Sequence, residues 1–211
     1  MEQKLWKDVS QLFLSIEFRI NQLLDNDNPD ADDVISNSEN NILIVREDIR
    51  KQLDSLRILL SEYFTEQESY YILFAIIIYI DEDIQTKVLD KNHLSWPLLQ
   101  KEFYEVDDGG ELFYETLDHI LKKPQTPLFI FEIYYFCLKH GFTGKYIDDG
   151  VKIADYKNVL ENKILVNKIQ PEIVKSDDMA MISSLISPLW YYGAAAVFLG
   201  FSYLGFVLFV T

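Results

Sequence analysis

The side chains that most often do chemistry are few and scattered in this sequence. The three histidines, His93, His119 and His140, lie on separate predicted elements, and none forms the Glu-x-x-His pair of a di-iron centre. Cys137 is the only cysteine, which excludes an internal disulfide and argues against a structural zinc site. Its apolar neighbours favour a packed thiol over a nucleophile. We therefore expect no metal and no cofactor.

One short segment looks superficially like a phosphate-binding loop. Gly144 is followed by Lys145, but Gly141 stands three positions earlier rather than five, and Tyr146 occupies the Ser/Thr position. Neither GxSxG nor HExxH occurs. We expect no small-molecule substrate and no enzymatic activity, and a membrane-tethered hydrolase is the least favoured alternative.

Asp81 and Glu82 form an acidic pair at the end of a strongly apolar stretch. Adjacent residues on a helix point about 100° apart, so the two carboxylates cannot act as a matched acid and base on one atom. Two interpretations remain open. They are solvated charges that end a buried helix, or they belong to a surface that a partner recognises.

The elements around these residues are predicted to be helical. Apolar residues recur with a period near 3.6, and no convincing strand alternation occurs. Thr65 and Glu68 have capping-box spacing ahead of the apolar residues 70–80, which we expect to form a central buried helix. Ser95 is expected to cap a later helix, and Gly141 to end another. The predicted fold is an all-α bundle of about seven helices, approximately 3–24, 39–63, 66–83, 95–106, 111–122, 128–140 and 152–168.

The charge of the chain restricts the partners that it can bind. The formal net charge is −15, and all charged side chains precede residue 179. Nucleic acids and anionic membrane surfaces need basic patches, so neither is an expected ligand. Basic protein surfaces are easier to accommodate.

The C-terminal part is predicted to be a membrane anchor. Residues 189–210 are 22 nearly all apolar residues, a length that crosses a bilayer core as a helix. A buried core helix is the alternative. We expect a cytoplasmic domain over residues 1–168, a juxtamembrane linker over 169–187 and a transmembrane anchor over 188–210. Small residues at Gly193, Ala196 and Gly200 share one stripe of the predicted membrane helix and are candidates for self-association.

The expected localisation is the inner membrane of a bacterium, with a single pass and a cytoplasmic N-terminal domain. The first residues are amphipathic and charged, unlike a signal peptide. Because Thr211 follows the predicted anchor directly, we expect no domain on the far side.

Three stretches together resemble one protein family. The first is Asp81-Glu82 at the end of its apolar helix. The second is Trp96 with the later segment 109–114, which reads Gly-Gly-Glu-x-Phe-Tyr, and the third is the segment 135–146. In this order, ahead of a C-terminal apolar helix, they are similar to the DotU/TssL (IcmH) family of type VI and type IVB secretion systems.

The resemblance implies a non-catalytic inner-membrane component with two packed helical bundles in a hook-like arrangement. Its implied partners are an IcmF/TssM-like inner-membrane protein, cytoplasmic baseplate proteins and further copies of itself. Asp81 and Glu82 become candidate partner contacts. The residues implied to set turns of the fold are Gly109, Gly110, Glu111, Gly141, Phe142 and Gly144. The alternative is a tail-anchored helical adaptor that is unrelated to secretion.

Overall fold

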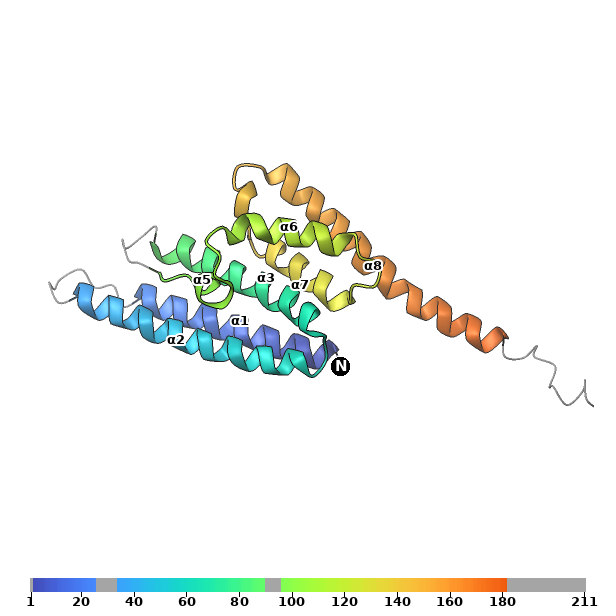
Figure 1. Cartoon of the computed structure of the whole chain (residues 1–211), viewed down its shortest axis with the longest axis horizontal. Helices are drawn as coiled ribbons and strands as arrows, with labels where there is room; N and C mark the ends of the chain where they lie inside the picture. Colours follow the sequence, from blue (N-terminus) through green and yellow to red (C-terminus); the bar gives the residue numbers. More distant parts are fainter. Residues whose placement is uncertain (1, 26–33, 90–95, 182–211) are drawn as a thin grey trace, which may run out of the picture. The chain divides into compact units, whose positions relative to one another are not determined.

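The computed structural model describes residues 2–25, 34–89 and 96–181, which form seven α-helices and no strand. The α-helices are α1 (Glu2–Asp25), α2 (Val34–Ser61), α3 (Glu66–Ile84), α5 (Leu99–Tyr104), α6 (Gly109–Leu121), α7 (Leu128–Lys139) and α8 (Gly150–Met181) (Figure 1). A π-helical turn, η1 (Gln85–Leu89), extends α3, and a 3₁₀ turn, η2 (Gly144–Tyr146), precedes α8. The all-α prediction is confirmed for this part of the chain. The chain divides into two compact units, Met1–Leu165 and Val166–Thr211, and the sites below lie in the first.

Helix α3 is the centre of the first unit, as the sequence predicted. The Thr65 hydroxyl accepts the Glu68 N–H while the Glu68 carboxylate accepts the Thr65 N–H, so both capping-box bonds form. Buried side chains occupy every position from Tyr71 to Ile78. Such a helix must be covered on all sides, and α3 packs against α2, α5, α6 and α7.

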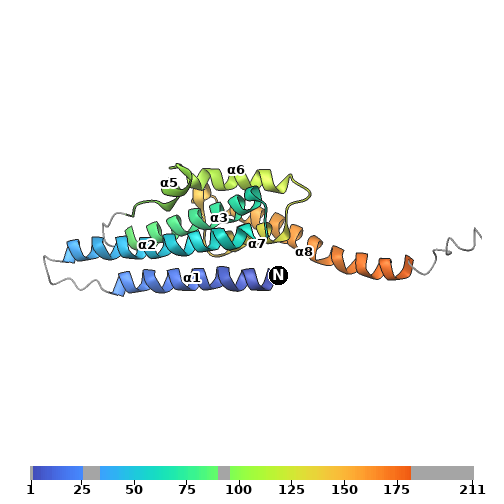
Figure 2. The ribbon, with the colours of Figure 1, turned by 60° about the horizontal axis from the view of Figure 1, so that its bottom comes forward.

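Helices α1 and α2 form an antiparallel pair beside α3. Figure 2 shows the two helices running side by side. Their facing apolar stripes are buried: Leu5, Val9, Leu12, Ile16 and Ile20 on α1, and Ile42, Val45, Ile49, Leu53, Leu56 and Leu60 on α2. Trp6 joins α1 to α7, since its Nε1 donates to Glu132 at 2.7 Å.

The three largest differences from the predicted boundaries are at α2, α5 and α8. Helix α2 begins at Val34 rather than 39, and α5 begins at Leu99 rather than at a Ser95 cap. Helix α8 continues to Met181, through part of the predicted linker. A proline such as Pro171 removes one backbone hydrogen bond but does not compel a helix to stop.

None of the helices in the described part of the chain is long and apolar enough to cross a membrane. The predicted membrane helix at 188–210, with Gly193, Ala196 and Gly200, lies outside the described residues.

Candidate functional site

Asp81 binds the start of helix α5. Its Oδ1 accepts hydrogen bonds from Trp96 Nε1 at 2.8 Å and from the Leu99 N–H at 3.0 Å, and its Oδ2 accepts the Gln100 N–H at 2.8 Å. Leu99 and Gln100 are the first residues of α5, whose own N-cap, Leu98, offers no side-chain acceptor. Asp81 therefore caps α5 from another helix.

Glu82 binds a different segment, the loop after α7. Its Oε1 accepts the Thr143 N–H at 2.6 Å and the Thr143 hydroxyl at 3.0 Å, while its Oε2 accepts the Gly144 N–H at 2.8 Å. The two neighbouring carboxylates thus point to different segments, as their helical spacing predicted. Asp81 thereby ties α3 to the start of α5, and Glu82 ties α3 to the loop after α7.

The solvated-charge interpretation is wrong for Asp81, which is 2% exposed. Burial raises the pKa of the Asp81 carboxyl, and hydrogen bonds from Gln100, Trp96 and Leu99 partly oppose that rise. The sequence did not reveal this role because the donors lie 15–19 residues away for Asp81 and 61–62 residues away for Glu82. A direct contact with a partner stays a prediction for both residues.

The glycines near Glu82 allow two backbones to touch. Gly144 has φ +49°, and a Cβ there would lie 2.6 Å from the Gly110 oxygen. A Cβ on Gly109 would overlap the Gln100 and Ile78 side chains. Gly109 and Gly110 themselves do not have positive φ, so close approach is their requirement. The left-handed residue that ends α5 is Glu105, with φ 58°.

Gly141 ends α7 as predicted. Its φ is +104°. The Phe142 N–H donates to the Cys137 carbonyl at 3.1 Å, which is the 6→1 hydrogen bond of a Schellman motif. Phe142 then enters the core, with its ring centroid 4.2 Å from that of Phe113 on α6. Glu111, on the exposed side of α6, makes a long ion pair of 3.7 Å with Lys145.

The other residues considered for chemistry do not converge. Cys137 is fully buried, and burial raises the pKa of its thiol well above its ordinary value. His119 and His140 lie on α6 and at the end of α7, and His93 falls outside the described residues. Within the described ranges, no group of three or more His, Cys, Asp or Glu side chains is arranged to hold a metal ion.

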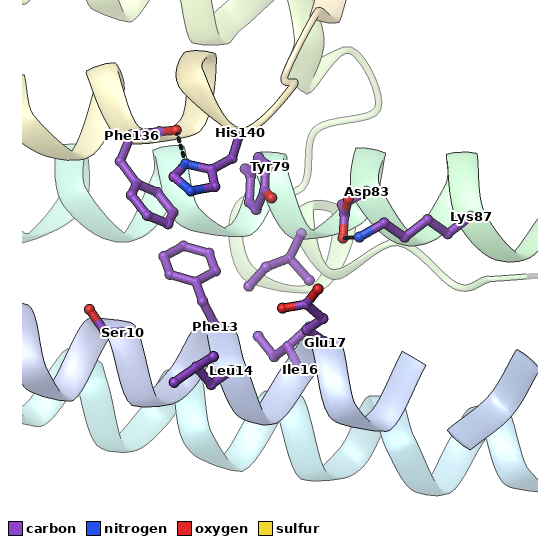
Figure 3. Close-up of a pocket in the computed structure, with 11 residues that line it drawn as sticks. Ser10, Phe13, Leu14, Ile16, Glu17, Tyr79, Asp83, Lys87, Phe136 and His140 are labelled. Atoms are coloured by element: carbon purple, nitrogen blue, oxygen red, sulfur yellow. Dashed lines mark hydrogen bonds and ion pairs between the residues drawn. The ribbon is translucent and has the colours of Figure 1, made fainter. Parts of the chain in front are cut away.

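A groove that the sequence did not reveal lies between α1, α3 and α7 (Figure 3). Its volume is about 440 Å³. Three rings from the three helices form its wall: the centroid of Phe13 lies 4.7 Å from that of Phe136 and 5.5 Å from that of Tyr79. The His140 ring stacks on Phe136 at 3.9 Å.

Carboxylates stand at one end of this groove. Figure 3 shows Glu17 from α1 and Asp83 from α3 on the same side of the Tyr79 ring. Burial raises the pKa of the Tyr79 phenol, and the charges of Asp83 and Glu17 raise it further. Lys87 is the cation at this end, and its Nζ lies 2.9 Å from Asp83. The groove combines aromatic walls with excess negative charge, an arrangement suited to binding a cationic group.

Comparison with known proteins places the chain in a family. The family model described as "Type VI secretion system protein DotU" matches residues 33–209. The solved structure of DotU from Francisella novicida is similar, with 28% sequence identity, a TM-score of 0.60 and coverage of 74% of this chain and 97% of that one. The structure of SciP/TssL from enteroaggregative Escherichia coli 042 also matches, with 21% identity, a TM-score of 0.46 and coverage of 73% and 86%. No protein with a curated description matches the chain. The match over residues 33–209 shows that the chain belongs to the DotU family of type VI secretion system proteins.

Proposed function

We propose that this protein is a structural, non-catalytic subunit of a type VI secretion membrane complex. Residues 188–210 anchor it in the bacterial inner membrane, and the helical domain lies on the cytoplasmic side. There it links an IcmF/TssM-like membrane protein to cytoplasmic baseplate proteins, and the chain self-associates.

The family match over residues 33–209 carries this proposal, because it covers the described helices from α2 onward and nearly all of the apolar C-terminal run. The 22 apolar residues 189–210 have the length that a membrane helix needs. The alternative, a tail-anchored adaptor that is unrelated to secretion, would require a member of this secretion-system family to have acquired a different role.

The site supports a binding role more than a catalytic one. The carboxylates of Asp81 and Glu82 accept hydrogen bonds from backbone N–H groups of the same chain. By holding α5 and the 143–144 loop, they fix two surface segments that a partner could read. We propose that partner contacts involve α5, the 143–144 loop and the carboxylates of Asp81 and Glu82.

A secretion assay tests the proposed function. A strain without the gene is expected to lose type VI effector release, and the intact gene is expected to restore it. Release that continues unchanged in the deletion strain, with no second copy of the gene, would contradict a role in this apparatus.

A further inference from the structure

The groove between α1, α3 and α7 has the chemistry of a receptor for one side chain. Its walls are the rings of Phe13, Tyr79 and Phe136, and its volume of about 440 Å³ is large enough for a long side chain. Faces of aromatic rings attract cations within about 6 Å of the ring centroid. The walls alone therefore favour a flat or cationic group.

The charges at the mouth select a cation. Glu17 and Asp83 contribute two carboxylates, and Lys87 is the one lysine or arginine among the residues that line the groove. The Asp83–Lys87 pair spans one helical turn, and the lysine is 42% exposed, so an incoming cation can replace it at little cost. A guanidinium fits better than an ammonium, since it stacks on rings and binds carboxylates through two N–H groups.

The surface beside the mouth is apolar. Leu14 and Phe18 lie one turn apart on α1 and are 64% and 60% exposed. The two side chains form a small apolar surface on one stripe of α1, next to the groove that Leu14 also lines. A bound segment would place apolar residues on these two side chains while its cationic side chain enters the groove.

We propose that this groove binds an arginine of a partner protein, carried on an amphipathic segment with apolar residues on either side. Charge complementarity sets the choice, because a second copy of a chain with net charge −15 would bring mainly more negative charge. The proposal rests on the proposed function in one respect: the partner is a cytoplasmic subunit of the same apparatus.

The direct test titrates the full-length chain in detergent with Nα-acetyl-arginine methylamide. The methyl NMR signals of Leu14, Ile16 and Ile80, which line the groove, report binding, and those of Ile153 serve as a distant control. The citrulline analogue has nearly the same shape without the charge, and it is expected to bind at least about tenfold more weakly. Equal binding of the two probes, or no shift of the groove methyls with arginine, would overturn the proposal.

A pair of variants assigns the effect to the groove. Glu17→Gln is expected to weaken arginine binding about fivefold, while Glu115→Gln, an exposed glutamate on α6, changes it by less than twofold. An unchanged affinity in Glu17→Gln would remove the groove as the site.

The cellular test separates this inference from the proposed function. In the deletion strain, Glu17→Arg is expected to fail to restore secretion, although it still co-purifies with the IcmF-like protein, and Glu115→Arg is expected to restore it. Normal secretion with Glu17→Arg overturns the groove proposal alone. Normal secretion in the deletion strain itself overturns the proposed function, whatever arginine does in the groove.

Discussion

Replacing Asp81 with alanine removes the acceptor of three donors at once. Trp96 Nε1 and the N–H groups of Leu99 and Gln100 would lose a partner in a buried site. Each unsatisfied buried donor costs about 1–3 kcal/mol. Part of that loss is offset, because the burial that raises the pKa of Asp81 also makes its charge expensive. We expect the free energy of unfolding to fall by about 3 kcal/mol, the scale for removing one member of a buried charged interaction.

Asp81→Asn provides a finer test of the same geometry. The amide oxygen can still accept from Trp96 and Leu99, which both bind Oδ1 in the native protein. The amide nitrogen would instead face the Gln100 N–H, so two donors would meet there and one of the three hydrogen bonds to residue 81 would be lost. We expect a loss of about 1–2 kcal/mol, between the native protein and the alanine variant.

Two measurements on the full-length chain in detergent decide the matter. Thermal unfolding followed by circular dichroism gives the stability order, with Asp148→Ala as the control for an exposed aspartate. Hydrogen exchange of peptides covering residues 98–104 reports the α5 amides directly, and exchange is expected to accelerate there first. If Asp81→Ala matches Asp148→Ala in both measurements, Asp81 does not cap α5.

Four further predictions follow from the same contacts. Gly144→Ala places a Cβ 2.6 Å from the Gly110 oxygen at φ +49°, and it is expected to lower stability by about 2 kcal/mol in thermal unfolding, whereas Gly150→Ala, with open space, is neutral or slightly stabilising. The folded-state pKa of Asp81 lies above its ordinary 3.8. The free energy of unfolding of the native protein should therefore exceed that of Asp81→Asn by the largest amount below pH 3.8, and this difference should shrink as the pH rises through the folded-state pKa. A difference that grows with pH in unfolding measurements would contradict the raised pKa. The buried Cys137 thiol should react with iodoacetamide at mild alkaline pH only when the chain is unfolded, as mass spectrometry can measure, and rapid labelling of the native chain would contradict its burial. Gly200→Leu should weaken self-association in detergent while Ala194→Leu, on another face of the predicted membrane helix, does not; unchanged oligomer size in both would exclude the stripe of Gly193, Ala196 and Gly200.

The sequence predicted the local features of the fold well, because short-range physics decides them. Hydrophobic period placed the helices, the spacing of Thr65 and Glu68 predicted a capping box that forms, and Gly141 ends α7 as expected. Continuous apolar sequence at residues 70–80 indicated the central helix correctly. Each of these signals lies within a few residues of the structure that it predicts.

The features that the sequence did not reveal depend on segments far apart in the chain. Ser95 seemed the natural cap of the next helix, but the cap is Asp81, and only the folded chain brings the two segments together. A carboxylate at the end of an apolar helix resembles a solvated charge unless its distant donors are known. The groove similarly needs Phe13, Tyr79 and Phe136 from three helices, and each of these residues alone looks like ordinary core.

The most direct test of the central proposal is co-purification from native membranes. The tagged full-length chain is expressed at its natural level, and the proteins that it retains after mild detergent extraction are identified by mass spectrometry. A chain without residues 188–210 serves as the matched control. The proposed role predicts that the full-length chain recovers an IcmF-like membrane protein together with baseplate proteins. A full-length chain that reaches the membrane but recovers no IcmF-like protein would contradict it.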